Sequence, residues 1–255
     1  MTARILIADV ERVPAWTKPL PVWDMKGLQY RRLSPNEIET WGRTICLAYR
    51  WGFTGPIKFI AEWQEGGRAG YLDAVAKLFD EADVLSGHNS KGFDFPHLQG
   101  DILMDGRTPL PEPKHIDTLL LARRHANWEA NHLDTLTRRL GIPAKTDKYR
   151  IAVAMGAVEG DVKMQRVIER YNRGDVRAST GMLKKFLPLS PVNLGLFAED
   201  PTRPVCTACE KRTLQRRGFS VKAALRYPRY QCQSCGKWQT SKTSIPVGSV
   251  EMRPA

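Results

Sequence analysis

Two pairs of cysteines near the C-terminus restrict the folds open to this chain more than any other feature of its sequence. Cys206-Thr-Ala-Cys209 and Cys232-Gln-Ser-Cys235 both have the form Cys-x-x-Cys, and 22 residues separate them. Four thiolates at such spacing are typical of one tetrahedral Zn²⁺ ion, whereas redox-active cysteines or chance spacing are weaker alternatives. Because the residues between the pairs are too few to build an apolar core, we expect the metal to be required for folding.

The N-terminal sequence predicts neither secretion nor membrane anchoring. The apolar run 5–7 is too short for the core of a signal peptide and is followed at once by acids. No apolar run approaches the roughly 18 residues of a membrane-spanning helix. We therefore expect a cytoplasmic protein, and without a secretory signal the cysteine pairs favour metal over disulfides. The fifth cysteine, Cys46, lies alone in a predicted strand and is most simply a core residue.

The net charge of +12 is concentrated in the C-terminal part of the chain. Residues 201–255 hold 11 Lys and Arg against 2 Asp and Glu, a balance of +9. Residues 1–200 hold 28 against 25, a balance of +3. This asymmetry indicates a polyanionic partner, most simply nucleic acid, although a solvated basic surface is the alternative.

The hydrophobic pattern predicts an α/β domain. A nearly continuous apolar run indicates a buried strand over 5–10, and 84–88 is predicted to be another buried strand. Further strands are predicted over 44–51, 56–61 and, as a short one, 115–117. Helical spacing predicts helices over 71–81, 93–103, 118–125, 133–140, 161–173 and 176–186, the last two separated or bent near Gly174. The Pro- and Trp-rich segment after the first strand is expected to be a loop. Three strands, a helix, a strand, a helix, a short strand and further helices predict a mixed sheet flanked by helices.

The chain is long enough for one substantial domain and a small appendage. We expect the α/β domain over residues 1–190 and a linker, with Pro191, Pro201 and Pro204, over residues 191–204. A small zinc-held domain with a basic surface is expected over 205–245, and a tail over 246–255.

Acidic side chains follow two of the predicted strands. Asp9 and Glu11 are two residues apart at the end of the first strand, so both project from one face. Asp94 follows the strand 84–88 and lies between Phe93 and Phe95. A carboxylate among large apolar groups is costly unless something pairs with it. A helix N-cap is the alternative for Asp94, because Pro96 suits a first helical turn.

A third acid lies in a late predicted helix. Tyr171 and Asp175 are four residues apart, so the hydroxyl and the carboxylate share one helix face. Taken alone, the pair is most simply a core tyrosine beside a surface aspartate.

Together these groups resemble the three exonuclease motifs of the DEDD superfamily, which has the ribonuclease-H-like fold found in polymerase proofreading domains. The motifs are Asp-x-Glu at Asp9, Asn-x3-Phe-Asp-x3-Leu at Asn89, and Tyr-x3-Asp at Tyr171. The tyrosine places the resemblance with the DEDDy branch (DnaQ-like), and residues 115–118 and 131–142 resemble its stand-alone phage and bacterial members. The resemblance covers roughly residues 4–188.

The resemblance implies a two-metal 3′–5′ exonuclease that releases nucleoside 5′-monophosphates. Asp9 would bridge two Mg²⁺ or Mn²⁺ ions, with Glu11, Asp94 and Asp175 completing the site directly or through water. Glu11 would also lie near the terminal 3′-hydroxyl. Tyr171 would orient the attacking water, since an ordinary tyrosine pKa of about 10 makes it a poor proton acceptor. Converging carboxylates repel one another unless cations are present, which agrees with this assignment.

Other residues of this domain are assigned less directly. Asn89 and Phe93 are candidate substrate residues, although they could equally be a turn residue and a core residue. Asp117 lies in an apolar stretch, so we expect a structural hydrogen-bonding role and leave it out of the metal set. The segment after the first strand carries aromatic residues that could stack on bases or pack onto the domain: Trp16, Trp23 and Trp41.

The cysteine module resembles a zinc ribbon, in which Cys206, Cys209, Cys232 and Cys235 would hold one structural Zn²⁺. Its basic residues suit phosphate contacts, whereas docking to a protein is the competing interpretation. The candidates for substrate contact in this module are Lys211, Arg212, Arg216, Arg217 and Trp238.

The sequence thus predicts a monomeric DNA exonuclease, acting on single-stranded or frayed 3′ ends, with a ribbon that holds DNA. Nothing in the motifs separates deoxyribose from ribose, so an exoribonuclease remains the first alternative. A binding module with an inactive nuclease fold and an accessory subunit of a polymerase or recombination complex are the others. By the resemblance, the chain belongs in a bacterial or phage-infected cell.

Overall fold

The computed structural model describes residues 3–17, 21–22, 35–143, 149–200, 203–222 and 225–245. The chain divides into two units, one over Arg4–Lys184 and one over Lys185–Ala255 together with Met1–Ala3. Each unit is considered by itself below. The predicted tail, 246–255, and Trp23 lie outside the described residues.

The larger unit is built on a five-stranded sheet with the order β6-β5-β1-β7-β8. β1 pairs antiparallel with β5 and parallel with β7, β5 pairs antiparallel with β6, and β7 pairs parallel with β8. This topology confirms the predicted mixed sheet. The strands are β1 (Ile5–Val13), β5 (Arg43–Trp51), β6 (Lys58–Ala61), β7 (Val84–Gly87) and β8 (Lys114–Asp117).

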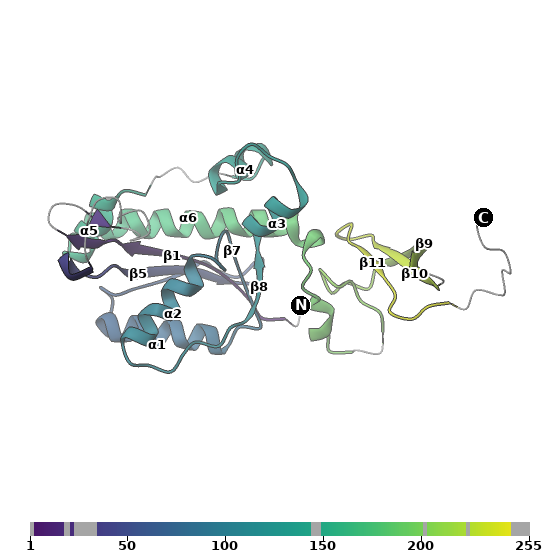
Figure 1. Cartoon of the computed structure of the whole chain (residues 1–255), viewed down its shortest axis with the longest axis horizontal. Coiled ribbons are helices and arrows are strands. Elements are labelled where there is room, and N and C mark those ends of the chain that lie inside the picture. The colour runs from purple at the N-terminus through teal and green to yellow at the C-terminus, as the bar shows by residue number, and fades with distance from the viewer. Residues whose placement is uncertain are drawn as a thin grey trace. The chain divides into compact units, whose positions relative to one another are not determined.

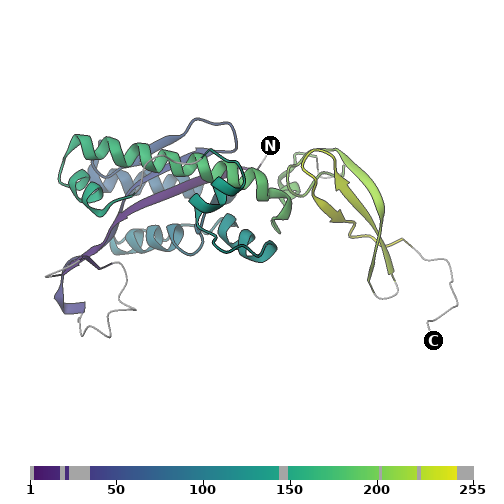
Figure 2. The ribbon, with the colours of Figure 1, turned by 90° about the horizontal axis from the view of Figure 1, so that it is seen from above.

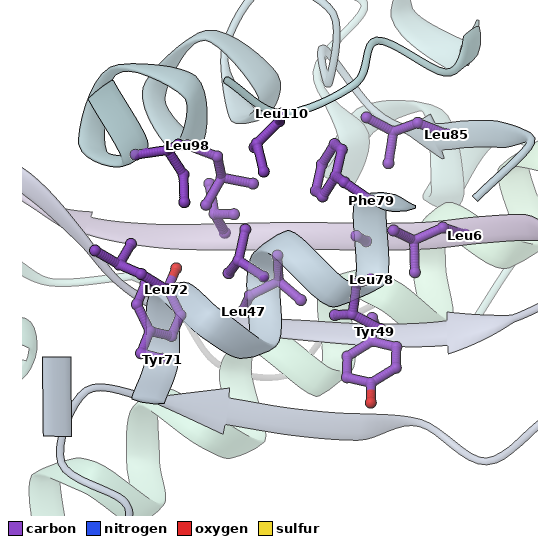
Figure 3. Close-up of a cluster of buried hydrophobic side chains, with 14 residues drawn as sticks. Leu6, Leu47, Tyr49, Tyr71, Leu72, Leu78, Phe79, Leu85, Leu98 and Leu110 are labelled. Carbon is purple, nitrogen blue, oxygen red and sulfur yellow. The ribbon is translucent and has the colours of Figure 1, made fainter. Parts of the chain in front are cut away.

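Helices lie on both faces of the sheet (Figures 1 and 2). They are α1 (Gly67–Asp80), α2 (Asp94–Met104), α3 (Thr118–His125), α4 (Leu133–Arg139), α5 (Ile151–Val158) and α6 (Val162–Phe186). Leu6, Ala8 and Val10 of β1 belong to a buried cluster with side chains from α1 and α2, among them Leu72, Phe79 and Leu98 (Figure 3). Because side chains alternate along a strand, the odd-numbered residues of β1 face the opposite side.

Three expectations differ from the structure. Residues 162–186 form one continuous helix, so the alternative of two separate helices is wrong. A glycine inside a helix costs about 1 kcal/mol relative to alanine, which the packing of buried residues such as Val176 and Leu183 offsets. Helix α5 was not predicted. The segment expected to be a loop contains a small sheet of β2 (Ala15–Thr17), β3 (Pro21–Val22) and β4 (Ile38–Thr40).

The smaller unit contains a three-stranded sheet, in the order β11-β10-β9, from β9 (Leu214–Lys222), β10 (Leu225–Cys232) and β11 (Trp238–Thr240). Among its described residues from 203 onward, the buried side chains are Cys206, Ala208, Pro228 and Cys232. The expected linker, 191–204, contains a 3₁₀ turn over Leu194–Phe197 and meets this module through a hydrogen bond from Leu194 N to Thr207 O (2.8 Å). Just before the linker, Ser190 O accepts a hydrogen bond from Lys237 Nζ (2.6 Å). The module therefore has almost no apolar core.

Within the described part of the chain, no helix is both long and apolar enough to cross a membrane.

Candidate metal centres and their surroundings

The C-terminal half of β1 carries Asp9 and Glu11 beyond the strand's pairing with β7. That pairing ends at Ile7 and Ser86, whereas the pairing with β5 continues past Glu11. Opposite Asp9 and Glu11 on β5 stand the small residues Ala48 and Cys46. Because Leu6, Ala8 and Val10 pack against α1 and α2 and side chains alternate along β1, both carboxylates lie on the opposite face of the sheet. Cys46 is fully buried, as predicted.

Beyond the end of β7, the carboxylate of Asp94 accepts a backbone hydrogen bond from β1. Asp94 is the first residue of α2, and its Oδ1 accepts a hydrogen bond from Val10 N at 2.9 Å. This contact occupies the backbone donor between the two carboxylates of β1. The pKa of Asp94 is raised to about 7, first by burial and then by the charges of Asp117 and Asp175. The carboxylate is thus held in a site that disfavours its charge unless a cation is near.

Helix α6 brings the fourth acid to the same place. Carboxylate oxygens of Asp9, Glu11 and Asp175 all lie within 4.8 Å of one another. Tyr171, one turn earlier, forms a hydrogen bond with Asp175, and burial together with the charges of Asp175, Glu11 and Asp9 raises its pKa. Its hydroxyl therefore remains neutral at physiological pH. The acidic trio could hold a metal ion, and its all-oxygen donors suit a hard divalent cation.

Asn172 also contacts the carboxylates, and the sequence did not single it out. Its Nδ2 lies 2.8 Å from Asp9 Oδ2, 3.0 Å from Asp9 O and 3.4 Å from Glu11 Oε1. The side chain is fully buried. The amide thus holds two acids of β1 from helix α6. Its position three residues before Asp175 was the one available signal, because residues i and i+3 are neighbours on a helix.

Replacing Asn172 with alanine is expected to raise the Mg²⁺ concentration that half-saturates any metal-dependent property of this site by about 10- to 100-fold. Partners that orient metal ligands have effects of this size, because free carboxylates must be ordered again on binding. Metal-induced thermal stabilisation measures the change. Ser179→Ala is the matched control, since it removes another buried polar group from α6. An unchanged Mg²⁺ requirement in Asn172→Ala would contradict the positioning role.

Tyr149 is a second neighbour that the sequence analysis missed. Its hydroxyl donates to Arg12 O at 2.7 Å, and its ring centroid lies 6.1 Å from that of Tyr171. Burial, followed by the charge of Glu11, raises its pKa. Two neutral tyrosines therefore lie near the carboxylates.

Asp117 has the structural role expected of it. Its Oδ1 accepts from the N–H groups of Asn89 (3.0 Å), Leu119 (2.9 Å) and Leu120 (3.3 Å), and its Oδ2 accepts from Lys91 N (3.0 Å). It caps α3 and holds the loop that leads to Asp94. It is therefore a scaffold for the site rather than part of the acidic trio.

The candidate substrate residues of the larger unit lie around this loop. Asn89 adopts a left-handed backbone conformation, with φ of 71°, and lines a pocket of about 480 Å³ together with Arg123 and Asn131. Phe93 is 36% exposed and packs edge-on against His97, with 4.6 Å between the ring centroids. Phe93 is therefore available at the surface beside Asp94, whereas a core residue was the alternative.

The tryptophans of the N-terminal segment differ in exposure. Trp16 is half-buried on β2, and Trp41 is 62% exposed at the edge of another pocket. Packing is therefore the simpler role for Trp16, whereas most of the Trp41 side chain is not packed against any described residue.

The four cysteines of the smaller unit form a second cluster. Their sulfur atoms all lie within 4.8 Å of one another, with Sγ–Sγ distances of 3.6 Å for Cys206–Cys235 and for Cys209–Cys232. A tetrahedron with Zn–S bonds of about 2.3 Å has edges of about 3.8 Å, so the cluster fits Zn²⁺. Burial opposes ionisation of Cys232, but hydrogen bonds from Thr213 and nearby backbone N–H groups lower its pKa to about 6, whereas burial raises the pKa of Cys209 to about 11 and also raises that of Cys235. The spacing of the four sulfur atoms is therefore the observation that shows that the cluster could hold zinc.

The basic candidates of this unit are exposed. Lys211 and Arg212 follow the first cysteine pair, and Arg212 forms an ion pair with Asp200 at 3.5 Å. Arg216 and Arg217 lie on β9. Trp238, on β11, is 48% exposed and lies under the guanidinium of Arg229, with Cζ 4.5 Å from the ring centroid. All five candidates are thus accessible, while Arg212 is already partly neutralised.

Comparison with known proteins gives a likeness in fold. No protein-family profile and no curated protein sequence matches the chain. Among solved structures 130 chains match, including the family B DNA polymerase from the hyperthermophilic archaeon Pyrobaculum calidifontis, with a TM-score of 0.51 and 19% identity. The match covers 73% of this chain and 25% of the polymerase chain. The likeness and the two clusters together confirm the predicted fold class, a ribonuclease-H-like mixed sheet flanked by helices with a small domain built around four cysteines.

Proposed function

We propose that this protein is a metal-dependent 3′–5′ exonuclease that hydrolyses phosphodiester bonds at the 3′ end of DNA. The observation that carries the proposal is the meeting of Asp9, Glu11 and Asp175 within 4.8 Å, with Asp94 hydrogen-bonded to the strand between them. Four carboxylates, two from strand β1 and one each from helices α2 and α6, are the ligand set that the DEDDy resemblance predicts.

Two Mg²⁺ or Mn²⁺ ions held by Asp9, Glu11, Asp94 and Asp175 would supply activation of water and stabilisation of the leaving 3′-oxygen. The chain's own part is positioning. Asn172 holds the carboxylates of Asp9 and Glu11 from one side. Val10 N–H fixes the carboxylate of Asp94 from the other.

Tyr171 orients the attacking water and does not remove its proton. Its pKa is raised by burial and by the surrounding carboxylates, so the phenol stays protonated. A neutral hydroxyl both donates and accepts hydrogen bonds, which suits alignment of water against a scissile phosphate. Glu11 lies in the same cluster and is the proposed contact of the terminal 3′-hydroxyl.

The other proposed substrate contacts lie in both units. In the larger unit they are Asn89, in the wall of its pocket, and Phe93, at the surface. In the smaller unit a ribbon held by one structural Zn²⁺ is proposed to grip the nucleic acid through Lys211, Arg212, Arg216, Arg217 and Trp238. The DNA polymerase likeness favours DNA over RNA as the substrate.

The test is digestion of 5′-labelled and 3′-labelled oligonucleotides by the purified full-length protein. With Mg²⁺ or Mn²⁺, single-stranded DNA is expected to shorten from its 3′ end and release 5′-mononucleotides, and a chelator is expected to stop the reaction. Duplex DNA and RNA run alongside. Faster digestion of RNA would replace DNA by RNA as the substrate, whereas binding without any cleavage would contradict an enzymatic function.

A further inference from the structure

The three-stranded sheet of the ribbon has a face on which two arginines flank one phenylalanine. Arg216 Cζ lies 4.9 Å and Arg226 Cζ 4.7 Å from the ring centroid of Phe219. Cation–π contacts of this kind restrict long side chains that would otherwise be mobile. We call Arg216, Phe219 and Arg226 the arginine–phenylalanine face.

A bulge in β9 creates this face. Strand alternation would place Arg216 and Phe219, three residues apart, on opposite sides of the sheet. The pairing instead puts Phe219 opposite Pro228 and Arg216 opposite Tyr230, with a register shift between those two β10 residues. Gly218 lies within the bulge at φ 74°, a conformation that glycine adopts without strain. The sequence Arg-Arg-Gly-Phe is thus folded so that arginine and phenylalanine side chains meet.

The charges on this face are available to an external anion. From residue 203 to residue 245 the sequence holds ten Lys and Arg and one acid, Glu210. Arg216 is exposed and Arg226 is half-buried, and the buried Nε of Arg226 has no hydrogen-bond partner among the described residues that would neutralise its charge. Phe219 remains 36% exposed, and Val221 beyond it is 69% exposed. An aromatic ring with ordered cations and exposed apolar surface matches a strand whose bases are unpaired and whose phosphates are accessible.

The opposite face of the sheet offers less to such a ligand. It carries Trp238, which is paired with Gln231 on the neighbouring strand, and Arg229, which is paired with Thr240. Arg229 stacks on Trp238, and the Nε of Arg229 already donates a hydrogen bond to Arg217 O at 3.4 Å. The two faces therefore differ in the number of ordered cations around an aromatic ring.

We propose that the arginine–phenylalanine face is a binding site for single-stranded nucleic acid, in which Phe219 and the guanidinium planes stack with unpaired bases while Arg216 and Arg226 contact phosphates. This inference rests on the proposed exonuclease function and specifies which residues of the ribbon contact the nucleic-acid strand. Stacking tolerates any base, so the site binds without sequence preference.

The test is fluorescence anisotropy with a labelled 20-nucleotide oligo(dT), using full-length, zinc-loaded protein with Ca²⁺ in place of Mg²⁺. Phe219→Ala is expected to weaken binding about tenfold, as loss of one stacked base does. Arg216→Gln combined with Arg226→Gln is expected to reduce the slope of log affinity against log salt by about 1.4, or about 0.7 for each phosphate contact.

The matched control removes two charges elsewhere. Lys222, next to Val221, points to the opposite face, and Lys242 lies beyond the three strands. Lys222→Gln with Lys242→Gln is expected to weaken binding less than the arginine pair. Equal losses in both double variants, or a loss in Trp238→Ala but not in Phe219→Ala, would overturn the proposal.

Two further measurements keep the outcome clear. Zinc content of one ion per chain reports that each variant ribbon is folded, and Phe219→Leu replaces Phe219→Ala if the alanine variant loses zinc. Hydrolysis of a dinucleotide by the wild type reports the proposed chemistry without a strand for the ribbon to hold. Phe219→Ala is expected to lose oligo(dT) binding, and the wild type is expected to hydrolyse the dinucleotide. Normal binding by Phe219→Ala sinks this inference alone, and absent hydrolysis in the wild type sinks the proposed function alone.

Discussion

Replacement of Asp9 by asparagine is expected to lower the rate of 3′-end hydrolysis by about 10³-fold or more. Asp9 lies in the acidic trio, and the loss of its charge removes several kcal/mol of metal-dependent stabilisation, at about 1.4 kcal/mol for each factor of ten. Initial rates on 5′-labelled single-stranded DNA at saturating Mg²⁺ measure the effect.

The same variant is expected to fold normally. The asparagine side chain has the shape of aspartate, and its amide oxygen can still accept the hydrogen bond that Asn172 Nδ2 makes at 2.8 Å. It also removes one negative charge from a crowded set of acids. Without metal, Asp9→Asn should therefore melt at the temperature of the wild type or above it, and it should lose most of the stabilisation by Mg²⁺, which amounts to about 2.7 kcal/mol at 100 times the dissociation constant.

Asp117→Asn is the contrasting control. Asp117 is a buried carboxylate in the same region, but unlike Asp9 it lies outside the acidic trio, and its oxygens accept hydrogen bonds from backbone N–H groups. Charge-assisted hydrogen bonds of this kind contribute more than neutral ones. This variant is expected to melt at a lower temperature while keeping its stabilisation by Mg²⁺. If Asp9→Asn retains full activity, or if only Asp117→Asn loses the response to Mg²⁺, the assignment of the carboxylates is wrong.

Loss of zinc is expected to unfold the ribbon and leave the larger unit folded. Among the described residues from 203 onward, two of the four buried side chains are cysteines of the cluster. No apolar core replaces the metal, and zinc contributes about 10–16 kcal/mol of apparent binding free energy in comparable small domains. Cys232→Ser, or a strong chelator, should therefore abolish the ordered β9–β11 sheet and lower affinity for single-stranded DNA at least tenfold.

Metal analysis, amide hydrogen exchange and anisotropy measure the three consequences. The wild type should hold one zinc per chain, and exchange should become fast in 214–240 alone. Cys46→Ala is the matched control, because Cys46 is buried in the larger unit and stands apart from the cluster. It should keep one zinc. A Cys232→Ser protein with a protected ribbon would show that the module folds without metal, and unchanged affinity would remove the ribbon from DNA binding.

Much of the fold was readable in the sequence because the relevant signals are local. Local sequence patterns, such as the apolar run at 5–10, predicted the five strands of the main sheet, and α3 was predicted at its observed bounds. The Cys-x-x-Cys pairs predicted a four-sulfur cluster for a similar reason, since each pair acts within one tight turn. Helix α5 and the sheet β2–β4 were missed, because short segments carry too few residues for a clear period.

The sequence by itself determined which acids are available and the order in which strands and helices carry them, since alternation along β1 alone puts Asp9 and Glu11 on one face. Only the tertiary structure decided what surrounds them. Asn172 reaches Asp9 across 163 positions of sequence, Val10 N–H meets Asp94 because β7 ends early, and the Gly218 bulge turns Arg216 towards Phe219. Such contacts depend on where strands stop and how a helix lies against them, and packing of the whole domain sets those positions rather than the identity of neighbouring residues.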